Sequence, residues 1–439
     1  MPISNIPINK GVVDEIIDKY GISDLGKATI REISSIVNDI EKATGVEFIR
    51  MEMGVPGLPP SQIGVNAQIQ ALNNGVASKY PLLEGEKVFK AEAARFMRAF
   101  ANIDLQPKNC IPTVGSMQGS FAAFLTISKL DPYKNTILFI DPGFPVQQIQ
   151  LQTLGIPFET FDVYHYRGSK LRKKLNKYLE RGNIAAIVYS NPNNPAWICF
   201  KEEELKIIGE LANLHDVIVI EDLAYFGMDF RADYAIPFKS PYQPTIAHYC
   251  NNYILLVSSS KTFSYAGERI ALMVISELLQ ERQYQSLSTQ FGMPYFGRYL
   301  VGRVLYSLSA GVSHSAQLAL AAIYKAASDG EYNFIKDVSE YGKRAKAIKE
   351  LFTKWGFTLI YNRDVDEPIA DGFYFTVNID GMHENELIHL LLYHGISAIP
   401  LHSTGSDFDG VRICVSQTSL NKIDDLNLRL KALQNSRTK

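Results

Sequence analysis

Residues with useful chemistry gather at four places where apolar, β-branched runs of the sequence begin or end. In an open α/β sheet, ligands bind beyond the carboxyl ends of the strands. We therefore expect the four segments to converge on one rim of a sheet, where their side chains would surround a common ligand. They are residues 115–117, 190–195, 221–225 and 258–264.

One group of these residues is suited to binding an anion. Gly115-Ser116-Met117 opens a predicted helix, and the free N–H groups and the dipole of a helix N-terminus favour a phosphate. Alone, this segment would more often be an ordinary serine-containing helix start. Ser258, Ser260 and Arg269 add two hydroxyls and a cation with bidentate geometry, so the whole cluster predicts a phosphate site.

A lysine and an aspartate nearby are suited to covalent catalysis on a heterocycle. Lys261 lies in a loop of small hydroxyl residues, where its amine can be desolvated and partly neutral, as a Schiff-base lysine requires. Most lysines, by contrast, are simply exposed. Asp222 ends a predicted buried strand, where a carboxylate is costly unless it meets a cation such as a protonated pyridine nitrogen. The alternative for Asp222 is an ordinary strand-end cap.

Two aromatic residues complete the set. Tyr225 could reach the same ligand from one side, and Phe144, which follows the apolar run 136–140, could lay its ring on a planar group at the rim. Each could equally be a packed core residue. A phosphate pocket, a reactive lysine, a pyridine-pairing aspartate and a stacking aromatic together describe one cofactor, pyridoxal 5′-phosphate.

The elements that must position these residues alternate along the chain. Short apolar runs are separated by helical patterns, which is typical of a mostly parallel sheet with helices on both faces, an α/β fold. The predicted strands are residues 136–140, 184–189, 217–221, 253–257 and 270–275, and the predicted helices are residues 118–130, 146–154, 171–180 and 202–215.

The rest of the chain predicts a smaller α+β domain. Long helical patterns at 312–327 and 331–353 precede short strands at 373–377, 396–399 and 411–415 and a closing helix near 420–433. The mostly helical N-terminus ends in a Gly/Pro-rich segment at 54–60, which we expect to join the C-terminal third. We therefore predict a large domain at 71–311 and a discontinuous small domain at 1–70 and 312–439.

Composition excludes several classes of protein. The 439 residues carry 44 Lys+Arg and 46 Asp+Glu, a net charge of −2, which gives no general attraction to nucleic acid. The four cysteines form no CxxC pair, so we predict no zinc site and no disulfide framework. We predict no other metal site either. No apolar stretch approaches the roughly 18 residues that span a bilayer. We predict a cytoplasmic protein that binds neither membrane nor nucleic acid.

The segment from Ser258 to Ile270 resembles the lysine motif of the class I/II aminotransferases, the aspartate-aminotransferase-like branch of the fold-type I pyridoxal-phosphate enzymes. Arg269 follows Lys261 by eight residues, as in that motif. The resemblance implies a mostly parallel seven-stranded sheet, a homodimer, and transfer of an amino group between an amino acid and a 2-oxo acid. The reaction would be ping-pong, through a Schiff base on Lys261.

The resemblance also implies roles for individual residues. Lys261, Asp222 and Tyr225 would be catalytic, with Tyr225 and Asn194 on the ring oxygen and Asp222 on the pyridine nitrogen. Tyr80 would reach the phosphate of the partner subunit. Arg412 would grip the substrate α-carboxylate, with Gly54 and Asn194 beside the substrate. The cofactor-binding set is Gly115, Ser116, Met117, Phe144, Asn194, Asp222, Tyr225, Ser258, Ser260, Lys261, Arg269 and Tyr80.

The sequence departs from the family pattern at two positions. The Asn194-Pro195 pair is followed by Ala196-Trp197 instead of Thr-Gly, and we expect the bulky indole to reshape the substrate pocket. Glu268 stands before the phosphate arginine, where the family often has a hydrophobic residue. Arg298 and Arg303 could meet a distal carboxylate of the substrate or be surface arginines.

Other activities remain open at this point. The same scaffold supports β-elimination, decarboxylation and α-oxoamine condensation, because the residues above generate a carbanion without deciding its fate. A non-catalytic regulator that binds the cofactor is much less favoured, since the stretch before Tyr80 offers no basic recognition helix.

Overall fold

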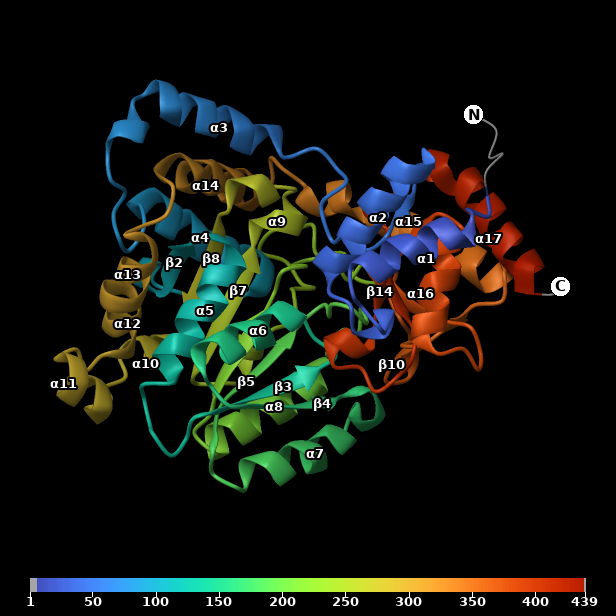
Figure 1. Cartoon of the computed structure of the whole chain (residues 1–439). Helices are drawn as coiled ribbons and strands as arrows, with labels where there is room; N and C mark the ends of the chain where they lie inside the picture. Colours follow the sequence, from blue (N-terminus) through green and yellow to red (C-terminus); the bar gives the residue numbers. More distant parts are fainter. Residues whose placement is uncertain (1–5, 438–439) are drawn as a thin grey trace.

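The computed structural model describes residues 6–437, and its largest element is a seven-stranded sheet (Figure 1). Six strands run parallel, and β8 alone runs antiparallel to both of its neighbours. This confirms the predicted fold class. The strands, in spatial order, are β2 (Cys110–Thr113), β8 (Ala271–Ile275), β7 (Tyr253–Ser258), β6 (Ile218–Asp222), β5 (Ile184–Ser190), β3 (Thr136–Asp141) and β4 (Phe158–Asp162).

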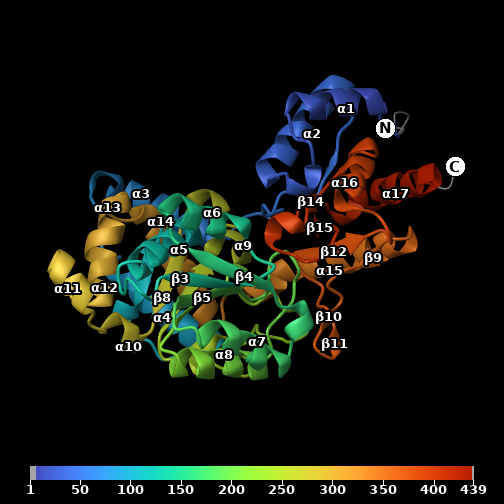
Figure 2. The same ribbon diagram turned by 60° about the horizontal axis from the view of Figure 1, so that its bottom comes forward.

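Helices cover both faces of this sheet. Figure 2 shows α5 (Gly115–Ile127) and α6 (Pro145–Leu154) on one face and α7 (Lys170–Leu179) and α8 (Glu202–Leu214) on the other. Every residue of β5, β6 and β7 is buried, as expected for strands covered on both faces. The predicted helices and central strands are confirmed. Neither edge strand was predicted: β2 has only the four residues CIPT, with a proline among them, and β4 has the sequence FETFD, which is partly exposed and mixes polar with apolar residues.

A smaller region lies to one side of the large sheet (Figure 2). Its four-stranded antiparallel sheet has the order β14 (Ile399–Pro400), β15 (Val411–Cys414), β12 (Tyr374–Asn378) and β9 (Thr358–Leu359). We call this sheet and the helices around it the small region. The helices are α1 (Lys10–Lys19), α2 (Ile30–Thr44), α15 (Phe334–Lys354), α16 (Glu384–Tyr393) and α17 (Ile423–Arg437).

The N-terminal segment contacts this region, and within the Gly/Pro-rich segment the carbonyl of Val55 accepts from the hydroxyl of Ser416. Strand β1 (Ile49–Arg50) pairs in parallel with β13 (Ile396–Ser397), and the N–H of Cys414 donates to the carbonyl of Met51 at 3.0 Å. The sequence analysis expected one strand at residues 396–399. The structure instead has β13 and β14 on either side of Ala398, and they belong to different sheets.

Helix α2 shows why the N-terminal segment folds as it does. Thr29 and Glu32 form a capping box at its start, and Gly45 ends it in the left-handed conformation at φ +70°. Apolar residues at helical spacing bury one face of the helix. These residues are Ile33, Ile36, Val37 and Ile40. The cap fixes where the helix begins, which places Ile30 beside the cavity described below.

Helices α3 (Gln62–Asn73), α4 (Lys87–Ala101) and α14 (His314–Ser328) pack together beside the large sheet (Figure 1). Both α3 and α14 lie largely in sequence ranges that we assigned to the small domain, and the boundaries at residues 70 and 312 stay a prediction. None of the helices within residues 6–437 is both long and apolar enough to cross a membrane. The shorter elements are α9 (Ser259–Thr262), α10 (Glu277–Gln280), α11 (Gln285–Phe291), α12 (Phe296–Tyr299), α13 (Tyr306–Ser309), β10 (Arg363–Asp364) and β11 (Glu367–Pro368).

Candidate active site

A cavity of about 410 Å³ lies between the rim of the large sheet and the small region. Its wall contains every predicted site residue except Gly115, which packs just behind it, and Tyr80. The predicted residues that line it are Gly54, Ser116, Met117, Phe144, Asn194, Asp222, Tyr225, Ser258, Ser260, Lys261, Arg269 and Arg412. The four segments therefore meet at one rim, as the sequence predicted.

Strand register brings the catalytic candidates together. Ser190 at the end of β5 lies opposite Asp222 at the end of β6, and β7 beside it ends at Ser258. Ser258 caps the short helix α9: its hydroxyl accepts a hydrogen bond at 3.1 Å from the N–H of Ser260. Lys261 follows within that helix. The turn after β7 thus directs the lysine toward the strand ends.

One end of the cavity has the donors that a phosphate needs. Gly115 has φ +66°, and a Cβ there would lie 2.5 Å from Nη2 of Arg269, so only glycine allows the guanidinium to approach the start of α5. The hydroxyl of Ser116 is buried and has no hydrogen-bond partner within the described residues. A buried hydroxyl is costly when unpaired, and a phosphate oxygen would satisfy it. These residues fit a bound phosphate group.

The electrostatics of Lys261 suit a nucleophilic amine. Burial lowers its pKa to about 8, and the positive charges of Arg269 and Arg412 act in the same direction. A substantial fraction of the amine is therefore neutral near physiological pH, which condensation with an aldehyde requires.

Asp222 is a buried carboxylate in need of a cation. Its Oδ1 accepts from the N–H of Ala224 at 3.1 Å, and its Oδ2 accepts from Nε2 of Gln147 at 3.0 Å. Burial nevertheless raises its pKa to about 6. A protonated pyridine nitrogen would supply the missing positive charge. The sequence analysis did not identify Gln147, which lies one helical turn into α6, three residues after Phe144.

The opposite end of the cavity is built around Arg412. Its Nη1 donates to Oδ1 of Asn194 at 3.1 Å, and its Nη2 donates to the carbonyl of Glu52. Its Nε is buried without a hydrogen-bond partner within residues 6–437. The guanidinium carbon also lies 4.3 Å from the centre of the Tyr374 ring. Arg412 is thus fixed in place and retains a free donor for an incoming carboxylate.

Tyr374 is the main residue that the sequence analysis missed. The hydroxyl of Tyr225 donates to that of Tyr374 at 2.8 Å, and a Cβ on Gly54 would lie 2.1 Å from the Tyr374 oxygen. A side chain at position 54 would therefore clash with Tyr374, which explains the glycine there. The signal that could have found Tyr374 is the pairing of β12 with β15, which places Thr376 opposite Arg412 and Tyr374 two residues away on the same face.

The expectation for Trp197 was wrong. The indole is fully buried and is not part of the cavity wall; it packs edge-on behind Tyr225, with ring centroids 5.2 Å apart. Gly372 makes room for it, because a Cβ there would lie 1.8 Å from the indole. Trp197 thus supports Tyr225 from behind and does not narrow the pocket.

Glu268, Arg298 and Arg303 also lie outside the cavity wall. Glu268 accepts a hydrogen bond from Gln68 of α3. The guanidinium of Arg298 stacks on Tyr295 at 4.9 Å, and that of Arg303 stacks on Phe291 at 5.3 Å. Neither arginine lines the cavity within this chain.

Tyr80 is the predicted site residue that the fold leaves outside. Its side chain is 93% exposed, and it does not line the cavity of its own chain. The apolar wall of the cavity includes three residues that sequence reasoning did not identify, Ile30, Met53 and Val55.

Comparison with known proteins gives the site its context. Residues 47–430 match the family model for aminotransferase class I and II. The chain is 24% identical over 433 residues to an aspartate aminotransferase of Pyrococcus horikoshii. The aligned region covers 95% of this chain and 98% of the relative. It is 22% identical over 237 residues to an asparagine–oxo-acid transaminase of Streptococcus mutans, and this aligned region covers 53% of this chain and 58% of that protein.

Solved structures share the fold. The alanine aminotransferase of Pyrococcus furiosus superposes with a TM-score of 0.74 at 17% sequence identity, over 93% of this chain and 97% of that one. An aspartate aminotransferase of Thermus thermophilus, solved with maleate, gives a TM-score of 0.72 at 16% identity, over 93% and 96%. With the family model matching most of its length, the chain belongs to the class I and II aminotransferases.

Proposed function

We propose that this aminotransferase uses pyridoxal 5′-phosphate to move an amino group between an amino acid and a 2-oxo acid. The observation that carries the proposal is the meeting of Lys261, Asp222, Arg269 and Arg412 in the wall of one cavity. Lys261 would react with the aldehyde and Asp222 would pair with the pyridine nitrogen. Arg269 would bind the phosphate, and Arg412 would bind the substrate carboxylate. The relatives named aspartate aminotransferase and asparagine–oxo-acid transaminase support the same reaction class.

Residues of the cavity could bind four parts of the cofactor. Ser116, Ser258, Ser260, Arg269 and the N–H of Met117 would bind its phosphate. Asp222 would pair with the ring nitrogen, and Phe144 would stack on the ring. Tyr225 and Asn194 would bind the ring oxygen.

Bound pyridoxal phosphate supplies an aldehyde that condenses with amines and a ring that accepts electrons from the substrate Cα. Arg412 binds the α-carboxylate and so fixes the direction of the Cα–H bond. Nζ of Lys261 would take the proton from Cα and deliver it to the former aldehyde carbon of the cofactor, and would carry it back to Cα in the reverse half-reaction. Asp222, by remaining ionised, keeps a positive charge at the ring nitrogen. The sequence of two half-reactions is ping-pong.

Transamination is distinguished from the other reactions of the scaffold by its products. Loaded protein is mixed with an amino acid in the absence of an oxo acid. We expect one equivalent of 2-oxo acid and one of pyridoxamine phosphate per site. Release of ammonia would indicate β-elimination and release of carbon dioxide would indicate decarboxylation, and either as the main product would contradict the proposal. A screen of amino donors with 2-oxoglutarate then identifies the substrate.

We also propose a homodimer in which Tyr80 reaches the phosphate site of the partner. Tyr80 is 93% exposed and does not line the cavity of its own chain, so its side chain is free to contact a second chain. The test mixes Lys261→Ala protein with Tyr80→Phe protein. A hybrid dimer holds one site with both native residues, so cofactor affinity at that site should return to the native value. Affinity that stays at the Tyr80→Phe value after subunit exchange would contradict the exchange of Tyr80.

The cytoplasmic location expected from the sequence stays a prediction.

A further inference from the structure

The turn that carries Phe144 is held by the small region. Phe144 directly follows Gly143, whose N–H donates to the carbonyl of Thr404 at 2.8 Å. Next to Thr404, Gly405 has φ +81°, and a Cβ there would lie 2.2 Å from Oδ2 of Asp141. We call residues 401–410 the clasp loop. It contacts the turn at residues 141–144 through the hydrogen bond to Gly143 and the close approach of Gly405 to Asp141.

The clasp loop makes a second set of contacts, with the end of the neighbouring strand β4. Asp162 ends β4 directly opposite Asp141 at the end of β3. Its Oδ2 accepts from the N–H of Asp407 at 3.0 Å and from the hydroxyl of Tyr361, which lies 2.6 Å from the hydroxyl of Ser406. The clasp loop thus contacts the carboxyl ends of two adjacent strands of the large sheet.

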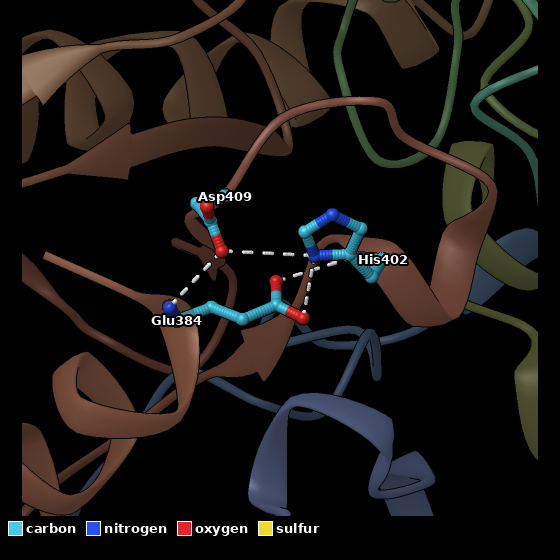
Figure 3. A group of neighbouring side chains, drawn as sticks. All are labelled: Glu384, His402 and Asp409. Atoms are coloured by element: carbon cyan, nitrogen blue, oxygen red, sulfur yellow. Dashed lines mark hydrogen bonds and ion pairs between the residues drawn. The ribbon is translucent and has the colours of Figure 1, made fainter.

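The base of the clasp loop is anchored to the small region. Figure 3 shows Glu384, His402 and Asp409 facing one another. The carboxylate of Glu384 accepts from the N–H groups of Leu401 and His402 and lies 2.8 Å from Nδ1 of His402, while Oδ1 of Asp409 accepts from the N–H of Glu384. The three ligand atoms are close enough for a cation. Because the Glu384 carboxylate already has three protein partners, we interpret the group as an anchor for the loop.

The turn has consequences beyond Phe144. Asn193 donates from Nδ2 to the carbonyl of Pro142 at 2.8 Å, which holds the turn from the side of the large sheet. The N–H of Gln147 donates to the carbonyl of Phe144, and the side chain of Gln147 donates to Asp222. The position of the turn therefore affects both the stacking ring and the carboxylate assigned to the pyridine nitrogen.

We propose that Thr404 and Gly405 are positioning residues for the cofactor: through the turn at residues 141–144 they set the placement of Phe144 and tie it to the position of the small region. The inference rests on the proposed function, in which Phe144 stacks on the ring.

The test is Gly405→Ala, with Gly381→Ala as its matched control. Both glycines have positive φ, +81° and +75°, but a Cβ on Gly381 meets no atom within 4 Å. The two variants therefore carry similar backbone strain and differ in the contact with Asp141. The readouts are the visible circular dichroism of bound pyridoxal phosphate, which reports the placement of its ring, and the dissociation constant of the cofactor.

We expect Gly405→Ala to change the visible circular dichroism and to weaken cofactor binding about tenfold, the equivalent of roughly 1.4 kcal/mol. Gly381→Ala should match the native protein. In an Asp141→Ala background most of the effect of Gly405→Ala should be lost, because the carboxylate is gone and only Cβ of residue 141, 3.1 Å from the added Cβ, remains close. Native values for Gly405→Ala, or the same change in Gly381→Ala, would overturn the inference. If the native protein binds no pyridoxal phosphate, the proposed function itself fails.

A second pair of variants applies if Gly405→Ala does not fold. Tyr361→Phe removes the hydroxyl that contacts Asp162 and Ser406 without adding volume, and it should shift the same two signals by a smaller amount. Its control is Tyr324→Phe, which removes another buried hydroxyl, one with no hydrogen-bond partner within the described residues. Equal signals in these two variants would overturn the inference.

Discussion

The two sides of the active-site cavity are built in different ways. On the side of the large sheet, Asp222, Ser258 and Lys261 lie at the ends of neighbouring parallel strands, and each is placed by a turn only a few residues long. On the side of the small region, Gly54, Tyr374 and Arg412 come from both ends of the chain and meet through strand pairing. The first side is assigned to the cofactor and the second to the substrate.

This difference indicates a division of labour. Local turns fix the groups that hold one unvarying cofactor, whereas long-range contacts assemble the groups that choose among substrates. Substitutions on the sheet side should therefore abolish the chemistry for every substrate. Substitutions of the small-region residues in the cavity wall, Gly54, Tyr374 and Arg412, should change substrate binding and leave cofactor binding largely unchanged.

The largest effect is expected from Lys261→Ala. Loss of the amine removes both the covalent attachment and the proton transfer, so kcat should fall by at least about 10⁴-fold for every amino donor. The measurement is steady-state formation of 2-oxo acid. Lys134→Ala is the control, because Lys134 is also partly buried with a pKa lowered by burial but lies outside the cavity. A loss of activity that differs widely between donors would contradict the division of labour.

Arg412→Ala should have the next largest effect. Removing the cation for the α-carboxylate should lower kcat/KM about 100-fold, mainly through KM, with the cofactor dissociation constant unchanged within about twofold. Arg344→Ala is a suitable comparison, since Arg344 is a buried arginine that donates to the carbonyl of Ser416 and does not line the cavity. Loss of cofactor from Arg412→Ala protein would show that the two sides are not separable.

The sequence predicts the residues on the sheet side of the cavity better than those on the small-region side. The strand-end rule located Asp222, Lys261 and the phosphate donors because each lies within a few residues of an apolar run. It did not find Tyr374 or Gln147, whose roles depend on which strands and helices become neighbours. It also gave the wrong expectation for Trp197, because proximity in sequence to Asn194 does not reveal that Gly372, far along the chain, provides a buried slot for the indole.

The secondary structure shows the same limit. Central strands with continuous apolar runs were predicted within one or two residues. The edge strand β4 was missed, because partial exposure permits the mixed sequence FETFD. The split of residues 396–399 into β13 and β14 depends on pairing with β1 and β15, from opposite ends of the chain.

The pH dependence of cofactor capture tests the state of Lys261 on the sheet side. Only the neutral amine condenses with the aldehyde, and burial together with Arg269 and Arg412 lowers the pKa of Lys261 to about 8 from 10.5. The neutral fraction rises with pH, so the capture rate of the cofactor-free protein should fall about tenfold for each pH unit below the midpoint near 8. Stopped-flow absorbance measures this rate. A midpoint above about 10 would contradict a desolvated amine.

The smallest effect is expected where the two sides meet. Tyr374→Phe removes the hydroxyl that accepts from Tyr225, so kcat/KM should fall by only about three- to tenfold, in keeping with one hydrogen bond. Tyr324→Phe again serves as the control. Equal activity in the Tyr374→Phe and native proteins would show that the tyrosine pair does not join the cofactor side to the substrate side.

The most direct test of the central claim is to locate the covalent attachment. Protein loaded with pyridoxal phosphate is reduced with borohydride, digested and mapped by mass spectrometry, with Lys261→Ala protein treated in parallel. We predict one phosphopyridoxyl group per chain, on Lys261, and none on the variant at the same cofactor concentration. Stoichiometric labelling of a different lysine in the native protein, or no labelling at all, would contradict the account.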